Sequence, residues 1–396
     1  MSDWLKQEVE ATKAQVIEWR RLFHQHPELG LEEHQTAARV AEILRSFGLP
    51  VKTGVGHVGV TAVLEGGRPG PTLILRADMD GLPIQEENET EYASKTPGVM
   101  HACGHDGHMA VLLGAANILS RNPDKFPGRI KFVFQPGEEG FGGANLMIKD
   151  GVLDDPPVDA ALGLHLISYL PVGMVGVKAG PFMACADWFH VKINGVSGHA
   201  AMPGTGGVDA ILIAAQSICA LQSLATKEIP PIEPFVLHVG TIEGGKKINI
   251  IADAVEFAGT VRLLNTDLRQ TISAKMDRIL AGVASSLGGT HELTYGEGYP
   301  PVVNDPAMTD LVRQAAGAVV SADNVAEIAP SMVAEDMAYF LEKVPGCFFF
   351  VGVANPDKGI TFSHHHGRFD LDEDALAIGT ETMIRAAMAY LEHPPQ

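Results

Sequence analysis

Hydrophobic and polar positions alternate along the chain in a way that predicts a sheet covered by helices. Three apolar runs, at residues 72–80, 129–139 and 159–166, predict buried strands. Between the first two, residues 105–120 predict a helix. Such alternation is typical of an α/β fold with a mostly parallel sheet. Each run ends in polar residues, at the edge where open α/β sheets place their sites.

Residues 182–296 follow a different order. Their pattern predicts a strand, a helix, two strands, a helix and a strand, which is the order of a ferredoxin-like α+β unit. Afterwards the first pattern resumes with two helices, a strand and a closing helix. We therefore expect a discontinuous catalytic domain, formed by residues 1–181 and 297–396, with residues 182–296 inserted as a second domain.

Composition and charge narrow the class of protein. The chain has 396 residues, of which 46% are hydrophobic, so it can bury a large core. A net charge of −19 without a basic cluster argues against nucleic acid or an anionic membrane as a partner. The chain has no signal-peptide pattern and no apolar run near the roughly 18 residues of a membrane span. Four widely spaced cysteines favour a reducing compartment, so we expect a soluble cytoplasmic protein.

The segment MHACGHDGHMAV, residues 100–111, concentrates histidines, a cysteine and an aspartate. Cys103 could be a nucleophile with His101 or His105 as its base. A structural turn with a buried cysteine is a second alternative. In CGH, however, thiol and imidazole lie two positions apart in a glycine-containing turn, where both can converge on one metal ion. Metal binding explains more of the polar strand ends, so we favour it.

Three other segments carry matching chemistry. Glu138 and Glu139 end an apolar run, where one carboxylate can hold a metal while the other takes a proton from water. His165 lies inside the run LGLHL, where a lone histidine is more often a core residue, but beside the other donors it becomes a ligand candidate. Three histidines at 364–366 precede the closing helix, and the pattern does not select one of them.

These segments together resemble the metal-dependent aminoacylase and carboxypeptidase superfamily, in the branch of hippurate hydrolases and indole-3-acetyl-amino-acid hydrolases. The likeness runs nearly end to end, in family order and spacing. The segments that carry it are HQHPELGLEE, RADMDGLPI, MHACGHDGHMA, FQPGEEG, GLH, GHAAMP, NIIADAVEFAGTVR, AEDMAYF and HHHGRFDLDEDAL. Such a set of segments is highly specific.

The resemblance implies a catalytic domain with two divalent metal ions. Their ligands would be Cys103, His105, Glu139, His165 and His365. The last ligand of the family lies four residues before the aromatic residue of its motif, here Phe369, and this selects His365. Cys103 stands where relatives outside the branch have a bridging aspartate, so its thiolate would contact both ions. Zinc, manganese, cobalt and nickel all suit such ligands.

The resemblance also implies the remaining roles. Glu138 would be the general base and proton shuttle, and Asp78 would orient the site. His199, on the inserted domain, would stabilise the oxyanion of the scissile carbonyl, often across a dimer in this family. Asn249 and Arg262 would grip the substrate carboxylate, the arginine through its planar fork of donors.

Three positions depart from the branch pattern. Gly204 replaces a histidine after AMP, Gly367 replaces a proline, and Gly81 replaces an alanine after RADMD. None of them removes a proposed ligand. The first alters a loop close to the substrate, so substrate preferences of relatives do not transfer directly.

We therefore expect a dinuclear metal amidohydrolase that cleaves small-molecule N-acyl amino acids into a carboxylic acid and a free amino acid. Alternatives are a metallo-carboxypeptidase or dipeptidase, a cysteine-nucleophile hydrolase, and a metal-dependent binding protein. A ferredoxin-like unit leaves one sheet face open and an edge strand unpaired. A homodimer or higher oligomer through residues 182–296 is the expected outcome.

Overall fold

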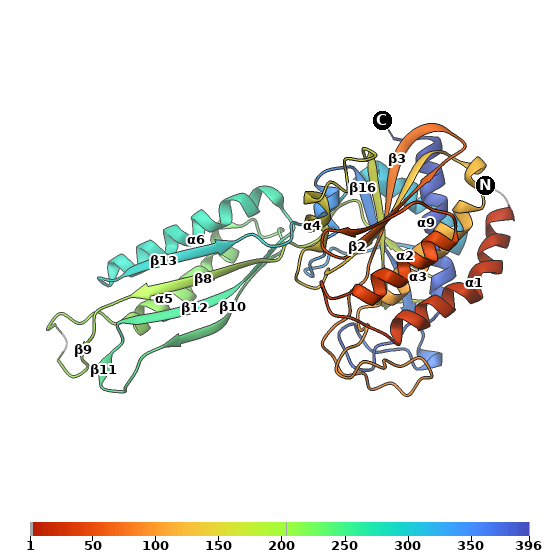
Figure 1. Cartoon of the computed structure of the whole chain (residues 1–396). Helices are drawn as coiled ribbons and strands as arrows, with labels where there is room; N and C mark the ends of the chain where they lie inside the picture. Colours follow the sequence, from red (N-terminus) through yellow and green to blue (C-terminus); the bar gives the residue numbers. More distant parts are fainter. Residues whose placement is uncertain (1–2, 203, 396) are drawn as a thin grey trace. The chain divides into compact units, whose positions relative to one another are not determined.

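The computed structural model describes residues 3–202 and 204–395, which form two compact units (Figure 1). The first unit comprises the described parts of residues 1–180, 303–329 and 336–396, and the second comprises residues 181–302 and 330–335. The second unit is thus larger than the predicted insert. Gly298 N–H donates to Asp187 at 3.0 Å, and Ser331 N–H donates to Phe182 O at 2.8 Å, which ties both additional segments to it.

The first unit is built on an eight-stranded sheet with the order β1-β2-β4-β3-β5-β16-β6-β15. In chain order its strands are Val51–Val55, Gly59–Glu65, Arg68–Asp78, Pro127–Gln135, Ala160–Pro171, Val175–Val177, Val325–Glu327 and Gly346–Ala354. The central strands β4, β3, β5 and β16 are parallel, whereas β1, β2 and β6 add antiparallel pairs. The predicted α/β fold with a mostly parallel sheet is confirmed.

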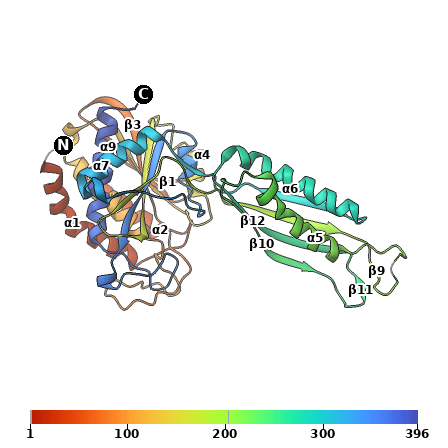
Figure 2. The ribbon, with the colours of Figure 1, turned by 180° about the vertical axis from the view of Figure 1, so that it is seen from behind.

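Helices cover this sheet. They are α1 (Asp3–His24), α2 (His34–Ser46), α3 (His105–Ser120), α4 (Gly143–Lys149), α7 (Pro306–Val320), α8 (Ala338–Leu341) and α9 (Asp374–Glu392). Helices α3 and α9 contact the central strands, and α1 packs over both (Figure 2). Helix α8, the second of the two helices predicted after the insert, has only four residues. Leu73, Ile74 and Leu75 are consecutive and all buried, as expected for a strand covered on both faces.

The parallel strands bring polar residues to one edge of the sheet. Strand β3 ends at Asp78, but β5 continues past His165 to Pro171, because β16 pairs with it over this length. His165 therefore lies within its strand, not at the end that the pattern predicted. Arg76 pairs with Gly163, and this register places His165 level with Asp78.

The second unit has the predicted β-α-β-β-α-β order. Its elements are β8 (Asp187–Asn194), α5 (Ala210–Leu221), β10 (Phe235–Gly244), β12 (Ala254–Leu263), α6 (Thr266–Ser286) and β13 (Thr290–Gly296). The strands form an antiparallel sheet in the order β10-β12-β8-β13, which is ferredoxin-like. Phe189, Val191 and Ile193 of β8 point into the unit's own core, whereas Trp188, immediately before Phe189, is exposed.

Short elements complete the chain. They are β7 (Gly180–Met183), β9 (Gly198–His199), β11 (Ile250–Ile251), β14 (Val302–Asn304), a π-helical segment at Leu224–Glu228, and 3-10 turns at Pro123–Lys125, Ala322–Asn324 and Pro356–Lys358. Strands β9 and β11 pair as a small separate ribbon. Pro203, the last residue of GHAAMP, lies outside the described residues.

Part of the second unit exposes apolar side chains. On α5, Ile211 and Leu212 are 50% and 47% exposed. Strand β10 is an edge strand and exposes Val236 and Ile242. The helical stretch Ala210–Glu228 is long and apolar enough to cross a membrane, but core helices of soluble proteins meet the same criterion. This apolar surface is the kind that a second protein chain covers.

A buried ion cluster joins α1 to the rest of the first unit. Arg20 is fully buried, and its guanidinium contacts Asp106 and Asp370, each at 2.8 Å. His24 lies 2.8 Å from the same oxygen of Asp106. Burial alone would raise the pKa of Asp106, but the charges of Arg20 and His24 hold it below its usual value. The cluster therefore keeps α1 attached to the start of α3.

We expect Arg20→Met to lower the free energy of unfolding by about 3–5 kcal/mol, because Asp106 would stay buried without its cation. Arg21→Met is the matched control. Arg21 binds Glu373 at the surface, where its side chain is 44% exposed, so its loss should cost at most about 1 kcal/mol. Urea titration of both variants measures the difference, and equal losses would contradict a special role for the buried cluster.

Candidate metal centre

The turn before α3 brings Cys103 and His105 together. Gly104 between them has a φ of 88°, a left-handed conformation that glycine adopts without strain. Cys103 Sγ lies 3.4 Å from His165 Nε2. His165 Nδ1–H donates to Leu166 O at 2.7 Å, so the neutral ring turns the lone pair of Nε2 towards the thiol. Burial and the neighbouring imidazole of His108 hold the pKa of His165 well below its usual value.

In His105, as in His165, Nδ1 carries the hydrogen and Nε2 faces the other candidate donors. His105 Nδ1–H donates to Asp80 O at 2.9 Å, while its buried Nε2 has no hydrogen-bond partner among the described residues. Burial by itself lowers the pKa of His105, but the negative charges of Asp78 and Cys103 raise it well above the usual value. The surroundings of this nitrogen therefore favour a bound cation.

Of the three consecutive histidines, the structure turns His365 towards the site. His365 Nε2 lies 3.1 Å from Glu139 Oε1. Its φ of 62° is a left-handed conformation that strains a residue with a side chain, as is common where function fixes the backbone. His364 instead donates to Leu166 O at 2.9 Å, and His366 is exposed. The backbone thus makes the selection that the sequence pattern left open.

The two adjacent glutamates sit on a turn that a buried carboxylate holds. Glu138 N–H and Glu139 N–H donate to the two oxygens of Asp80 at 3.0 and 2.9 Å. Gly140 N–H donates to Glu138 O at 2.7 Å and closes the turn. Glu139 then points to His365, whereas Glu138 Oε1 accepts from the N–H of Asp336 at 3.4 Å. The two carboxylates therefore have different neighbours at one end, although an oxygen of each also lies with His105 in one group of donor atoms within 4.8 Å.

Two of the five groups of candidate donor atoms among the described residues share Cys103. One contains Cys103, His105 and His165, and the other contains Cys103, Glu139 and His365, with the atoms of each group within 4.8 Å of one another. Cys103 belongs to both, as expected for a bridging ligand. Thiolate, imidazole and carboxylate suit zinc-like divalent ions. The buried Nε2 of His105 has no hydrogen-bond partner among the described residues, which also fits a bound cation.

Asp78 and Asp80 contact different residues around these donors. Asp80, not Asp78, accepts the hydrogen bond from His105 Nδ1–H. Asp78 accepts from His108 at 2.6 Å and from Arg76 at 2.8 Å, and lies 3.8 Å from His105 Nε2. The orienting role of Asp78 stays a prediction. The roles of Asp80 and His108 were missed, although both residues stood in the segments that the sequence singled out.

The surroundings of Cys103 do not suit a free nucleophile. A reactive cysteine needs a lowered pKa, but burial raises the pKa of the Cys103 thiol. His101, one of the two bases considered, is buried, and neither of its ring nitrogens has a hydrogen-bond partner among the described residues. Cys103 is better suited to a metal, which binds the thiolate directly.

The three predicted residues of the insert fall at two places. His199 and Asn249 lie together, since β9 pairs with β11 and Ala200 N–H donates to Asn249 O at 3.2 Å. Arg262 lies near the other end of β12, eight residues after Ala254, which corresponds to about 26 Å of strand. The structure therefore separates Arg262 from the other two residues within the second unit.

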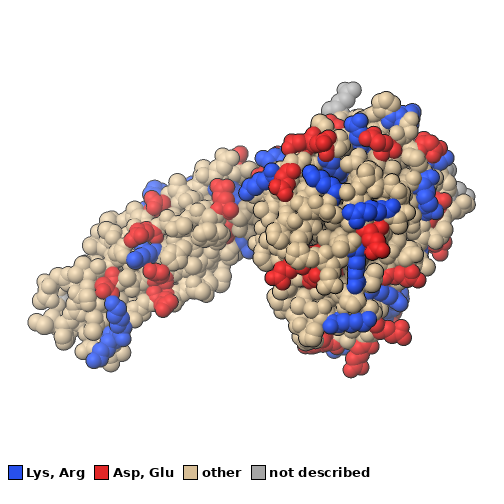
Figure 3. All heavy atoms as spheres, viewed as in Figure 1, with Lys and Arg blue, Asp and Glu red and all other residues tan. Residues whose placement is uncertain are grey.

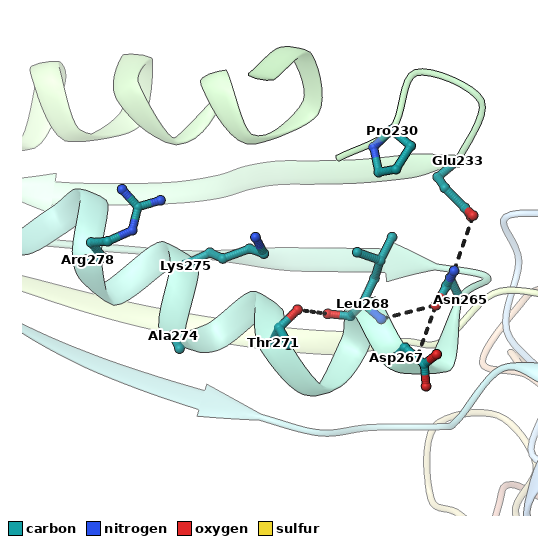
Figure 4. A pocket seen from close by; sticks show the side chains of 9 residues that line it. All are labelled: Pro230, Glu233, Asn265, Asp267, Leu268, Thr271, Ala274, Lys275 and Arg278. Carbon is teal, nitrogen blue, oxygen red and sulfur yellow. Dashed lines mark hydrogen bonds between the residues drawn. The ribbon is translucent and has the colours of Figure 1, made fainter. Parts of the chain in front are cut away.

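A hollow of about 580 Å³ in the second unit lies apart from this chemistry (Figure 4). Its lining side chains largely satisfy one another. Asn265 caps α6 and donates to Glu233, while Lys275 and Arg278 pair with Glu228. None of the donor groups described above contributes to this hollow, which we treat as part of the scaffold.

We expect divalent metal binding to the metal-free protein to release protons. Hydrogen bonds that the protonated ring of His365 donates to Cys103 and Glu139 raise its pKa to about 10, so the ring is charged at neutral pH until a metal displaces the proton. Affinity should therefore rise with pH. Titration calorimetry in buffers of different ionisation heat counts the protons. His365→Ala should release fewer of them and bind more weakly, whereas His366→Ala should match the parent; equal proton release in His365→Ala would contradict this.

Comparison with known proteins agrees with this arrangement. Residues 74–389 match the model of Peptidase family M20/M25/M40. The thermostable carboxypeptidase 2 of Saccharolobus solfataricus is 40% identical over 379 residues, covering 95% of each chain. The N-acyl-L-amino acid amidohydrolase of Geobacillus stearothermophilus is 46% identical over 301 residues, covering 76% of this chain and 80% of the relative.

A solved structure extends the likeness to the fold. The Bacillus subtilis YXEP protein, described as a dinuclear metal binding peptidase, is 33% identical and superposes with a TM-score of 0.87 over 97% of this chain and 99% of its own. Together with the paired donor groups, this likeness supports two divalent metal ions as the cofactor; it does not determine which metal. The chain therefore belongs to Peptidase family M20/M25/M40.

Proposed function

We propose that the protein is a metal-dependent amidohydrolase that cleaves the amide bond of N-acyl amino acids. The observation that carries this proposal is the adjacent pair Glu138 and Glu139 beside the metal donors. Glu139 lies in a donor group with Cys103 and His365, whereas Glu138 lies outside that group, close to His105, and accepts from Asp336 N–H. A ligand beside an independent base is what hydrolysis of an amide by activated water requires. The name of the Geobacillus relative supports the substrate class.

The proposed roles follow from these positions. Cys103, His105, Glu139, His165 and His365 would hold the two ions, which when bound polarise a carbonyl and make water more acidic. Glu138 takes a proton from the attacking water as the new C–O bond forms. Glu138 then gives this proton to the leaving nitrogen as the C–N bond breaks, which releases the acid and the free amino acid. Zinc, manganese, cobalt and nickel remain open as the ions.

The inserted unit supplies the proposed contacts to substrate. Arg262 presents a planar fork that suits a carboxylate, and Asn249 can donate to the same group. His199 is exposed and can stabilise the oxyanion that forms at the scissile carbonyl. These assignments rest on the segments shared with the superfamily, and the departure at Gly204 lies in the His199 loop.

The separation of Arg262 from His199 supports a site shared between subunits. Leu263, next to Arg262, accepts from Cys185 N–H at 2.8 Å, so Arg262 lies where the chain enters the unit. His199 lies at the opposite end of the sheet. Two groups so far apart in one domain can serve the same kind of site if one acts in its own subunit and the other in a partner. We therefore propose a homodimer through the exposed β10 edge and α5 face.

We propose a cytoplasmic location from the free cysteines, and small-molecule partners from the distribution of surface charge. The four cysteines are free thiols in the structure, which fits a reducing cytoplasm. On the face drawn in Figure 3, Lys and Arg are interspersed with Asp and Glu, without a broad basic area. Small acyl amino acids, and no nucleic acid, fit this surface.

A carboxypeptidase or dipeptidase is the second candidate, favoured by the name of the Saccharolobus relative. The chemistry at the ions would be the same, and the difference lies in the group on the amino side of the bond. Turnover of benzoyl-glycine compared with that of unblocked dipeptides separates the two functions. Preference for the blocked substrate supports the acyl-amino-acid assignment.

We expect Glu138→Gln to keep both metal ions but to lose roughly 10²-fold or more of kcat, because the amide cannot accept the proton. Glu139→Gln is the matched control at the neighbouring position and should lose metal. Elemental analysis and turnover of benzoyl-glycine check both variants. Near-normal turnover of Glu138→Gln would mean that another group moves the proton.

We expect a mixture of His199→Ala and Glu138→Gln subunits to recover activity that neither variant has alone, since some mixed dimers regain one intact site. Subunit exchange is verified by mass, and Ile211→Glu, on the exposed α5 face, should weaken the dimer. Absence of recovery despite exchange would favour a histidine acting within its own subunit, and a fully active monomer would rule out the shared site.

A further inference from the structure

The turn that carries the two glutamates is held from a second side. Three consecutive N–H groups, at residues 137–139, all donate to buried carboxylates. Those of Glu138 and Glu139 go to Asp80, at the end of β3. The first, Gly137 N–H, donates to Glu33 Oε1 at 2.7 Å. Glu33 stands immediately before α2, so the N-terminal region of the chain contacts the proposed catalytic turn directly.

The two segments also pack closely. Gly137 has a φ of 59°, and a Cβ there would lie 2.9 Å from the Leu31 side chain. A Cβ on Gly30 would lie 2.5 Å from the ring of Phe141. Glycine is therefore required on both sides of the contact. The backbone around Glu33 and the turn are therefore in close contact, and the hydrogen bond from Gly137 N–H to Glu33 helps to define their relative position.

The contact is close, but its register still depends on the hydrogen bond that Glu33 accepts. The Glu33 side chain is fully buried, and Oε2 has no hydrogen-bond partner among the described residues. Burial, with added repulsion from Asp80 and Glu28, raises its pKa to about 8. Glu33 is therefore largely a neutral acid at pH 7. It accepts the Gly137 N–H without adding a negative charge to a corner that already contains Asp80, Glu138 and Glu139.

We propose that Glu33 is a positioning residue for catalysis, which fixes the turn from Gly137 to Glu139 so that Glu138 reaches the attacking water. This inference rests on the proposed role of Glu138 as the base. Without Glu33 the buried Gly137 N–H would lose its partner, and the turn would shift to satisfy it. A small displacement of a base lowers kcat more than it changes substrate binding.

The test compares Glu33→Ala, Glu33→Met and Glu33→Gln in the metal-loaded enzyme. Alanine and methionine remove the acceptor, and methionine keeps the volume if alanine impairs folding. Both should lower kcat roughly tenfold or more with little change in KM. Glutamine keeps the acceptor and resembles the neutral acid, so it should restore most of the lost kcat. Metal content, measured by elemental analysis, should stay at the parental level in all three.

Glu28→Ala is the matched control. Glu28 accepts from Thr36 N–H at 2.7 Å and holds the same end of α2 without contacting the turn, so its kcat should stay near that of the parent. Parental kcat in Glu33→Met, failure of glutamine to restore kcat, or an equal loss in Glu28→Ala would each overturn the proposal. Glu138→Gln run alongside separates this result from the proposed function, since an active Glu138→Gln would refute the base and not the position of the turn.

Discussion

One buried carboxylate, Asp80, fixes the relative position of the proposed metal ligands His105 and Glu139 and the proposed base Glu138. Its oxygens accept from the N–H groups of Glu138 and Glu139, and its main chain and side chain face His105 Nδ1. A charge buried this deeply is stable only while its donors stay in place. The start of α3 and the turn after β4 are therefore held as one rigid body by a group that itself need not contact substrate.

A polar layer beneath the site extends this constraint into the sheet. Arg76 is fully buried and binds Asp78, Gln135 and Asp336 at 2.8 Å each. Because Arg76 and Gln135 lie on neighbouring strands, the layer ties β3 and β4 to the segment that donates to Glu138. Apolar packing stabilises the sheet. The hydrogen bonds and ion pairs of Arg76 fix the positions of the residues at the edge of the sheet that carries the candidate site.

Much of this was predictable from the sequence, because each proposed ligand stood near the end of an apolar run or in a glycine-containing turn. Parallel strands bring such positions to one edge, so Cys103, His105 and Glu139 could be grouped without coordinates. The pattern could not select His365, because residues 364–366 are all histidines. What distinguishes His365 is its left-handed backbone conformation, which the sequence does not reveal. The choice came from the family resemblance instead.

Other features needed the folded chain. The contacts of three donors with Asp80 depend on distances across separate elements. Glu33 ends the segment HQHPELGLEE, which carries part of the family resemblance, but the sequence assigned it no role. Arg262 and His199 lie at opposite ends of the insert because of how β12 and β9 pair. The sequence predicted only that both residues belong to this domain. The sequence pattern placed His165 at the end of its strand. In the structure β5 continues beyond His165, because β16 pairs with it over the additional residues.

The two ends of the insert are neighbours. Strands β8 and β13, which begin and end its sheet, pair side by side, and Ala186 N–H donates to Tyr299 O at 3.0 Å. A domain whose termini adjoin is a module that evolution can alter or exchange without cutting the core of its host. The proposed substrate contacts lie on this module and the proposed metal ligands lie outside it. A change in the module can therefore leave these ligands as they are.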